Sequence, residues 1–239
     1  MSARKTAQPR NREEELVVLF DVDNTLFDND RMQKDLFAHL DRNFGENASV
    51  RYREIYEELR KQLGYADYLG SLERYRLGKM NDPRFLKVSN WLVEYPFPKR
   101  VYPGAFEAIK QCRRWGKAVI LSDGDAVFQP RKVACSGLWK AFADNVLIFI
   151  HKEQELECVE QFYPARHYVM IDDKLRLLEA IKNIWQDRVT TVFVRQGHYA
   201  HDKKAIAKYR PADISIKRSA DLLKMKKTDL LPAKRAAGA

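Results

Sequence analysis

The sequence predicts an α/β fold, a doubly wound parallel sheet with an all-helical module inserted near its start. Short β-branched apolar runs recur along the chain without alternation, as expected of strands covered on both faces. Helical patterns separate those runs, and one long stretch contains helical patterns alone. The chain has 239 residues, of which 45% are hydrophobic and 32% charged, so one large domain with an inserted module can be accommodated.

Five apolar runs are the candidate strands of this sheet. They are 16–20 (LVVLF), 118–122 (AVILS), 146–150 (VLIFI), 168–171 (YVMI) and 190–194 (TTVFV). Two amphipathic stripes between them predict helices, one from Ala105 to Cys112 with a stop at Gly116, the other from Leu175 to Trp185. Ligands of such sheets bind at the carboxyl ends of the strands. Residues that follow the apolar runs are therefore the first candidates for a functional site.

The inserted module is expected to span residues 28–99, where no strand-like run occurs. Three helix starts are expected, at the capping-box pair Asp30 and Gln33, at Ser49, and at Asp82 with Pro83. The proline-rich stretch YPFPKRVYPG would lead the chain back to the sheet as a linker. We therefore expect a core of residues 13–27 and 100–216, a helical cap of residues 28–99, and basic tails at 1–12 and 217–239.

The positive charge of the chain is concentrated at its ends. Of the formal net charge of +10, residues 1–12 carry +4 and residues 217–239 carry +5, which leaves +1 for residues 13–216. Solvated or cloning-derived tails explain this distribution better than a nucleic-acid partner, which is not expected. No apolar run reaches membrane-spanning length, and no secretory signal opens the chain. The three cysteines are widely spaced and predict reduced thiols in a cytoplasmic protein.

Polar residues follow the first four apolar runs. They are Asp21 and Asp23, then Ser122 with Gly124, then Lys152, then Asp172 and Asp173. All should meet on one rim of the sheet, because the carboxyl ends of parallel strands share an edge. A carboxylate cluster without histidine or cysteine favours Mg²⁺ over zinc. Asp28 and Asp30 are expected to be hinge and helix-cap residues, Asp123 and Asp125 turn residues, and Asp173 either a metal ligand or a helix N-cap.

At these positions the chain resembles the haloacid dehalogenase (HAD) superfamily. The segment DVDNT, the serine of LSDGD, Lys152 and the IDD segment are similar to its four motifs, in the family order. The helical insertion directly after the first motif resembles a C1-type cap, and the likeness covers roughly residues 16–216. One departure is Glu153 after Lys152, where family members often have proline; Lys174 is a nearby but less favoured substitute.

The resemblance implies a Mg²⁺-dependent phosphatase that forms an aspartyl-phosphate. Asp21 would be the nucleophile, and Asp23 would protonate the leaving oxygen and then deprotonate water. Ser122, Lys152 and the backbone near Gly124 would bind the phosphoryl group. The Mg²⁺ ligands would be Asp21, the carbonyl of Asp23, Asp172 and Asp173. Dehalogenases of the family lack an acid at the position of Asp23, so a carboxylate there favours phosphoryl chemistry.

A small phosphorylated metabolite is the expected substrate, because a cap that closes over the site excludes macromolecules. Alternatives are a phosphomutase of the same fold and a weakly active HAD-like binding protein with basic tails. A receiver domain is disfavoured by the motif order. Aromatic and basic residues of the insertion suggest either a substrate pocket in which an arginine holds a second anionic group, or core aromatics beside solvated charges. These residues are Arg51, Tyr52, Arg53, Tyr56, Tyr65, Tyr68 and Arg74.

Overall fold

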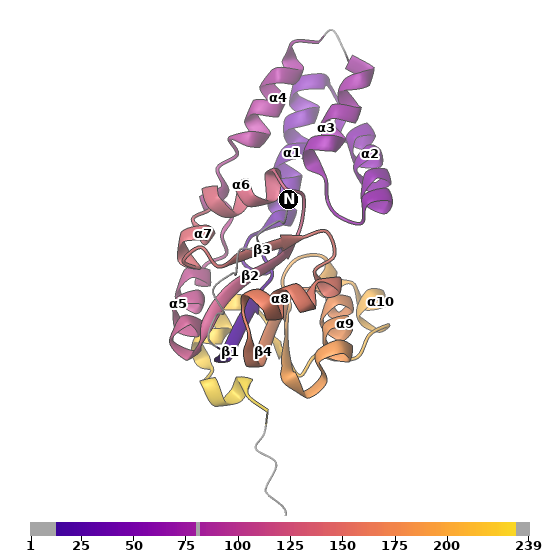
Figure 1. Ribbon diagram of the computed structural model, residues 1–239. Coiled ribbons are helices and arrows are strands. Elements are labelled where there is room, and N and C mark those ends of the chain that lie inside the picture. Colours follow the sequence, from indigo (N-terminus) through magenta and orange to yellow (C-terminus); the bar gives the residue numbers. More distant parts are fainter. Residues whose placement is uncertain (1–12, 80–81, 233–239) are drawn as a thin grey trace, which may run out of the picture.

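The computed structural model describes residues 13–79 and 82–232 and contains a six-stranded, all-parallel sheet (Figure 1). The strands run in the order β3-β2-β1-β4-β5-β6. Their bounds are β1 Glu14–Phe20, β2 Lys117–Asp123, β3 Val146–Phe149, β4 Ala165–Asp172, β5 Val189–Val194 and β6 Ile214–Ile216. The predicted doubly wound α/β class is confirmed. Strand β6 escaped prediction because its ISI sequence is too short to stand out as an apolar run.

Two layers of helices cover the sheet, and the alternation of side chains along β1 explains both. Val18 and Phe20 face the cluster that contains Ile109, whereas Val17 and Leu19 face the cluster that contains Ile181. The first layer comprises α5 (Ala105–Trp115), α6 (Phe128–Cys135) and α7 (Leu138–Ala141). The second comprises α8 (Leu156–Phe162) and α9 (Leu175–Trp185), followed further along the chain by the short α10 (Lys203–Ile206).

The insertion is helical throughout its described part and forms the upper lobe in Figure 1. Its helices are α1 (Asn29–Phe44), α2 (Ala48–Leu63), α3 (Tyr68–Arg76) and α4 (Arg84–Val93), of which α3 was not predicted. The expected capping box at Asp30 is wrong: Asp28 caps α1 by accepting the backbone N–H of Arg31 at 2.9 Å. Asp30 is free for a different contact, described below.

The two connections between the insertion and the sheet run side by side. The backbone N–H of Asp28 donates to the carbonyl of Arg100 at 2.7 Å, and that of Tyr102 donates to the carbonyl of Leu26 at 2.9 Å. Phe27 also forms an isolated antiparallel bridge with Val101. Such a two-stranded connection concentrates any motion between the cap and the sheet into a few residues.

The C-terminal segment differs from the expectation of a solvated tail from residue 217 onward. Two short 3₁₀ turns, Ser219–Lys224 and Lys227–Leu230, follow β6; the first packs against α5, and both contribute a leucine to the core cluster on that side of the sheet. Leu222 and Leu230 are fully buried there. The expected tail of residues 1–12 lies outside the described residues, as do residues 233–239. None of the helices in the described ranges combines the length and apolarity that a membrane crossing requires.

Candidate active site

Three buried aspartates meet at the carboxyl ends of β1 and β4. The register of the two strands pairs Phe20 with Ile171, and the N–H of Asp21 donates to the carbonyl of Ile171, so Asp21 lies beside Asp172. One carboxylate oxygen each of Asp21, Asp172 and Asp173 lies within 4.8 Å of the other two. The structure thus joins two segments that are about 150 residues apart, as the position of the motifs predicts.

Lys152 closes this cluster from the end of β3. Its ammonium lies 2.7 Å from Asp21 Oδ1 and 2.6 Å from Asp172 Oδ2, and the side chain is fully buried. Burial by itself would lower the pKa of Lys152, but the carboxylates of Asp172, Asp21 and Asp123 outweigh it and raise that pKa. Asp123, expected to be a turn residue, anchors the lysine by accepting its backbone N–H at 2.8 Å.

Other carboxylate oxygens of the cluster lack a hydrogen-bond partner among the described residues. Asp21 Oδ2 and both carboxylate oxygens of Asp173 make no hydrogen bond within residues 13–79 and 82–232, and all three atoms are buried. Burial raises the pKa of Asp172 to about 6, against the pull of Lys152, and it raises the pKa of Asp173 well above its usual range. Orphaned buried carboxylate oxygens of this kind suit a hard cation such as Mg²⁺. Asp173 is not the N-cap of α9, a position that Lys174 occupies.

Asp23 is not part of the cluster of three aspartates and forms an ion pair that the sequence did not reveal. Lys132 on α6 donates to both Asp23 oxygens, at 2.6 and 2.9 Å, and to Asn29 Oδ1 at 3.2 Å. Asn29 in turn donates to the hydroxyl of Tyr68 on α3 at 3.0 Å. The Lys132 side chain is 1% exposed and lies near the faces of three aromatic rings. This chain of contacts links Asp23 to the cap.

Ser122, near the end of β2, and Gly124, directly after it, have different surroundings. Ser122 is buried, and its hydroxyl accepts a hydrogen bond from Gln129 Nε2 at 3.0 Å, so the α6 side chain fixes its orientation. Gly124 is not free to bind a phosphoryl group through its backbone, because its N–H donates to the carbonyl of Phe149 at 2.9 Å. A Cβ atom at this glycine would overlap the Gln129 side chain. The close packing of α6 explains why a glycine stands here.

Asp30 connects the first cap helix to the loop after β5. Its carboxylate accepts the backbone N–H of His198 at 2.7 Å and lies 2.6 Å from the His198 ring nitrogen Nδ1. Asn24, whose φ of 63° puts it in the left-handed region, also donates to Asp30, at 3.0 Å. Gly197 leaves the room for Asn24, since a Cβ atom there would lie 2.4 Å from the Asn24 Cβ. The turn after β1, the first cap helix and the loop after β5 are therefore packed together as one unit.

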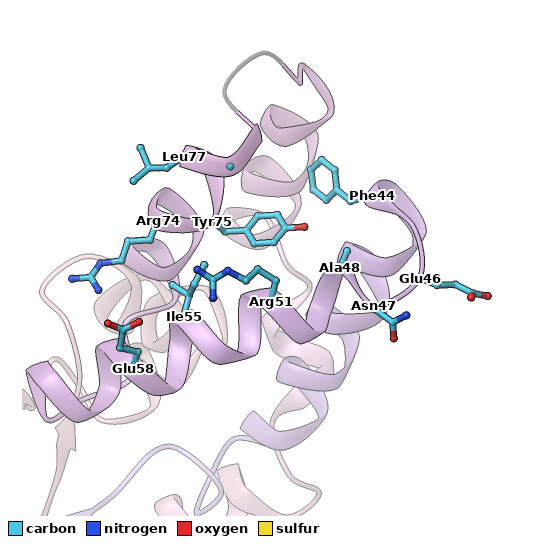
Figure 2. A pocket seen from close by; sticks show the side chains of 11 residues that line it. Phe44, Glu46, Asn47, Ala48, Arg51, Ile55, Glu58, Arg74, Tyr75 and Leu77 are labelled. Atoms are coloured by element: carbon cyan, nitrogen blue, oxygen red, sulfur yellow. The ribbon is translucent and has the colours of Figure 1, made fainter.

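A cavity of about 310 Å³ lies between the cap and the carboxyl rim of the sheet. Asp23, Asp123 and Lys174 line its core side, while Tyr56 and Arg60 of α2 line its cap side. Tyr56 and Tyr65 belong to it as the pocket hypothesis supposed, but Arg51 and Arg74 do not. They lie with Glu58 around a separate, open hollow near the tip of the cap (Figure 2). Arg60 is thus the cap arginine at this cavity, which the sequence pattern did not single out.

Comparisons with known proteins agree with this architecture. Residues 16–184 match the family model of haloacid dehalogenase-like hydrolases. A crystal structure of a candidate haloacid dehalogenase-like hydrolase from Burkholderia xenovorans LB400 is 56% identical, with a TM-score of 0.85, over 91% of this chain and 99% of that chain. No curated protein matches the chain.

Two more distant structures share the fold. An L-2-haloacid dehalogenase from Xanthobacter autotrophicus, with chloropropionic acid covalently bound, is 20% identical over 87% of this chain and 96% of that chain, with a TM-score of 0.58. A candidate β-phosphoglucomutase from Thermotoga maritima is 17% identical over the same shares, with a TM-score of 0.57. The match of the family model to most of the chain and the 56% identical relative are decisive: the chain belongs to the haloacid dehalogenase-like hydrolase family.

Proposed function

We propose that this protein is a phosphatase that hydrolyses a small phosphorylated metabolite through an aspartyl-phosphate on Asp21. The observation that carries the proposal is the pair of carboxylates at the end of β1. Asp21 belongs to the buried cluster beside Lys152, whereas Asp23, two residues on, lines the cavity between cap and core. A nucleophile and a proton donor must reach the reacting phosphoryl group from opposite sides, and the different surroundings of Asp21 and Asp23 support this pair of roles.

The residues around this pair support distinct roles in the reaction. Lys152 neutralises the charge of Asp21, which would otherwise repel an anionic phosphate. Ser122, oriented by Gln129, is a donor for a phosphoryl oxygen. Asp23 would hand a proton to the leaving oxygen and later take one from water, while Lys132 holds its carboxylate in place. Closure of the cap around the cavity excludes bulk water and large substrates.

Asp21, Asp172 and Asp173 would hold a Mg²⁺ ion, with the backbone carbonyl of Asp23 as a further proposed ligand. When bound, the ion supplies positive charge that stabilises the negative charge on the transferring phosphoryl group. The orphaned oxygens of Asp21 and Asp173 are the observation that supports this assignment. The three free cysteines fit a reducing compartment, which supports the proposed cytoplasmic location.

The test uses p-nitrophenyl phosphate and a chlorinated short-chain acid in parallel. Purified protein should release p-nitrophenolate in the presence of Mg²⁺, and EDTA should stop the reaction. Asp21→Asn should abolish turnover while the far-ultraviolet circular dichroism spectrum stays unchanged. Chloride release from the acid, without phosphate release from the ester, would instead assign a dehalogenase. With a sugar monophosphate as a third substrate, transfer of the phosphoryl group to another hydroxyl of the sugar, without release of free phosphate, would instead assign a mutase.

A further inference from the structure

The cavity between cap and core has an unusual balance of paired and unpaired charges. Its acidic lining residues are largely engaged: Asp23 with Lys132, Asp30 with His198, and Asp123 with the backbone of Lys152. The fourth, Glu57, is exposed on α2. Among the basic lining residues, Arg176 is paired with Glu153 at 3.1 Å. Arg60 has only an ion pair of 3.7 Å with Glu57, and Lys174 forms no ion pair within 4.0 Å among the described residues, although the charges of the aspartate cluster act on it.

Arg60 has a large unmet capacity to donate hydrogen bonds. A guanidinium carries five N–H groups, yet within residues 13–79 and 82–232 that of Arg60 makes no hydrogen bond and only a 3.7 Å ion pair with Glu57. Its side chain is 34% exposed and its guanidinium carbon lies 5.4 Å from the centroid of the Tyr199 ring. The ring contacts the guanidinium, whose N–H groups remain available for two parallel hydrogen bonds to an oxyanion.

Tyr199 brings the second cation to the same place. The ammonium of Lys174 lies 5.1 Å from the centroid of this ring, and Lys174 directly follows the cluster residue Asp173. Arg60 comes from the cap and Lys174 from the rim of the sheet, so the ring lies between the two lobes. An anionic group beside this ring would be attracted to both cations, whereas a neutral group would leave the Arg60 guanidinium partly desolvated and without a charged hydrogen-bond acceptor.

We propose that the substrate of this enzyme is a small phosphate monoester that carries a second anionic group, bound by Arg60 with Tyr199 as its platform. The inference rests on the proposed phosphatase function and adds the class of leaving group to it. A cavity of about 310 Å³ restricts that leaving group to a short chain or a single ring. The second anion is a carboxylate or a second phosphate, since both accept a bidentate pair of hydrogen bonds from arginine.

The assignment also explains how the substrate would select the closed cap. Arg60 lies on α2, in the middle of the inserted module, whereas the phosphate-binding groups lie on the sheet. A substrate with two anionic ends would contact both lobes only when they are together. It therefore binds the closed arrangement more tightly than the open one and shifts the population toward it. A phosphate monoester with a neutral leaving group lacks this second contact.

The experiment compares matched substrates and matched variants. The substrates are phosphate esters of short hydroxyalkanoic acids, their neutral amides, and alkanediol bisphosphates of equal length. The variants are Arg60→Gln and, as a control, Arg51→Gln. Arg51 lies on the same helix, also pairs with a glutamate of that helix (Glu54, at 2.9 Å), and lines the hollow at the tip of the cap (Figure 2).

In the wild type, kcat/KM for one anionic series should exceed that for the neutral amides by roughly 10- to 100-fold, the usual range for a charge-assisted hydrogen bond. Arg60→Gln should remove most of this preference, with a much smaller effect on the amides, whereas Arg51→Gln should preserve it. The series with the larger loss identifies the carboxylate or the phosphate as the second anion.

Equal kcat/KM for charged and neutral esters, or an equal loss for both in Arg60→Gln, would overturn the proposal while leaving the phosphatase function intact. If wild type hydrolyses none of the esters, including p-nitrophenyl phosphate with Mg²⁺, then the proposed function fails and this inference fails with it. Asp21→Asn measured on every substrate separates enzyme turnover from background hydrolysis.

Discussion

Asp173→Asn tests whether the buried aspartate cluster exists to hold a cation. Asp173 is fully buried and neither of its carboxylate oxygens has a hydrogen-bond partner in the described part of the chain. Burial and the neighbouring Asp172 raise its pKa, which means that the folded protein disfavours its charged form. The substitution removes one negative charge and keeps the size of the side chain. We expect opposite effects with and without metal.

The magnitude follows from two separate contributions. An unsatisfied buried polar group costs about 1–3 kcal/mol and a charged group costs more. The amide keeps the polar cost but removes the cost of the charge, so the metal-free variant should be more stable than the wild type by roughly 1 kcal/mol. The wild type should gain ~2.7 kcal/mol when free Mg²⁺ is 100-fold above its dissociation constant. For a chain of this length each kcal/mol corresponds to roughly 2–4 °C, so Mg²⁺ should raise the wild-type Tm by about 5–11 °C.

The assay is differential scanning calorimetry of both proteins in EDTA and in excess Mg²⁺. The variant should unfold at a higher temperature than the wild type in EDTA and should lose most of the increase that Mg²⁺ gives. Asp144→Asn is the matched control, because Asp144 is exposed and precedes β3, at the opposite end of the sheet. A variant that is less stable in EDTA and keeps the full Mg²⁺ response would refute the assignment of Asp173 to a cation site.

Three further predictions concern the pH dependence, the buried ion pair and one glycine. Burial raises the pKa of Asp172 from 3.8 to about 6, so the protonated Asp172 side chain stabilises the folded protein fully below about pH 4, and this stabilisation is lost as the pH rises through 6. Urea unfolding in EDTA should show a loss on the order of 3 kcal/mol. Saturating Mg²⁺ should abolish this loss. Lys132→Met should lower the free energy of unfolding by about 3 kcal/mol in the same assay. This value is at the low end for a broken buried ion pair, because the Asp23 side chain is 20% exposed. Unchanged stability would show that the Lys132–Asp23 pair does not stabilise the fold. Gly197→Ala should lower the free energy of unfolding by more than about 1 kcal/mol and should lower kcat, because Gly197 has a φ of 69° and a Cβ atom there would overlap Asn24. An unchanged Tm and kcat would contradict the close packing of the loop after β5 against the turn after β1.

Local sequence signals predicted the sheet and the buried cluster well. The run LVVLF is apolar on both faces, as a buried parallel strand should be. Its pairing with β4 then places Asp21 beside Asp172, because the carboxyl ends of parallel strands share an edge. The capping assignment failed because Asp28 and Asp30 flank the start of α1 and both have suitable side chains. Only the folded chain shows that Asp28 caps the helix, whereas Asp30 lies in its first turn and contacts His198. A short strand such as β6 carries too few residues for any periodicity to show.

Residues that act through long-range contacts were the ones missed. Lys132 looks like any helical lysine in the sequence, and only the folded chain brings it to Asp23, which is 109 positions away. Arg60 lies on a helix that carries two other arginines, and its position relative to the cavity depends on how the cap packs against the sheet. Spacing cannot distinguish such residues, because the rotation of the helix and the docking of the cap are set by the core as a whole.

The central claim is that Asp21 carries the phosphoryl group, and rapid-quench mass spectrometry tests it most directly. Protein mixed with p-nitrophenyl phosphate and Mg²⁺ is quenched in acid within the first turnover, digested and sequenced. We expect phosphate on the peptide that contains Asp21, at Asp21 itself, and none in Asp21→Asn or in EDTA. Release of free phosphate without any phosphorylated Asp21, or a phosphoryl group on another residue, would contradict the account.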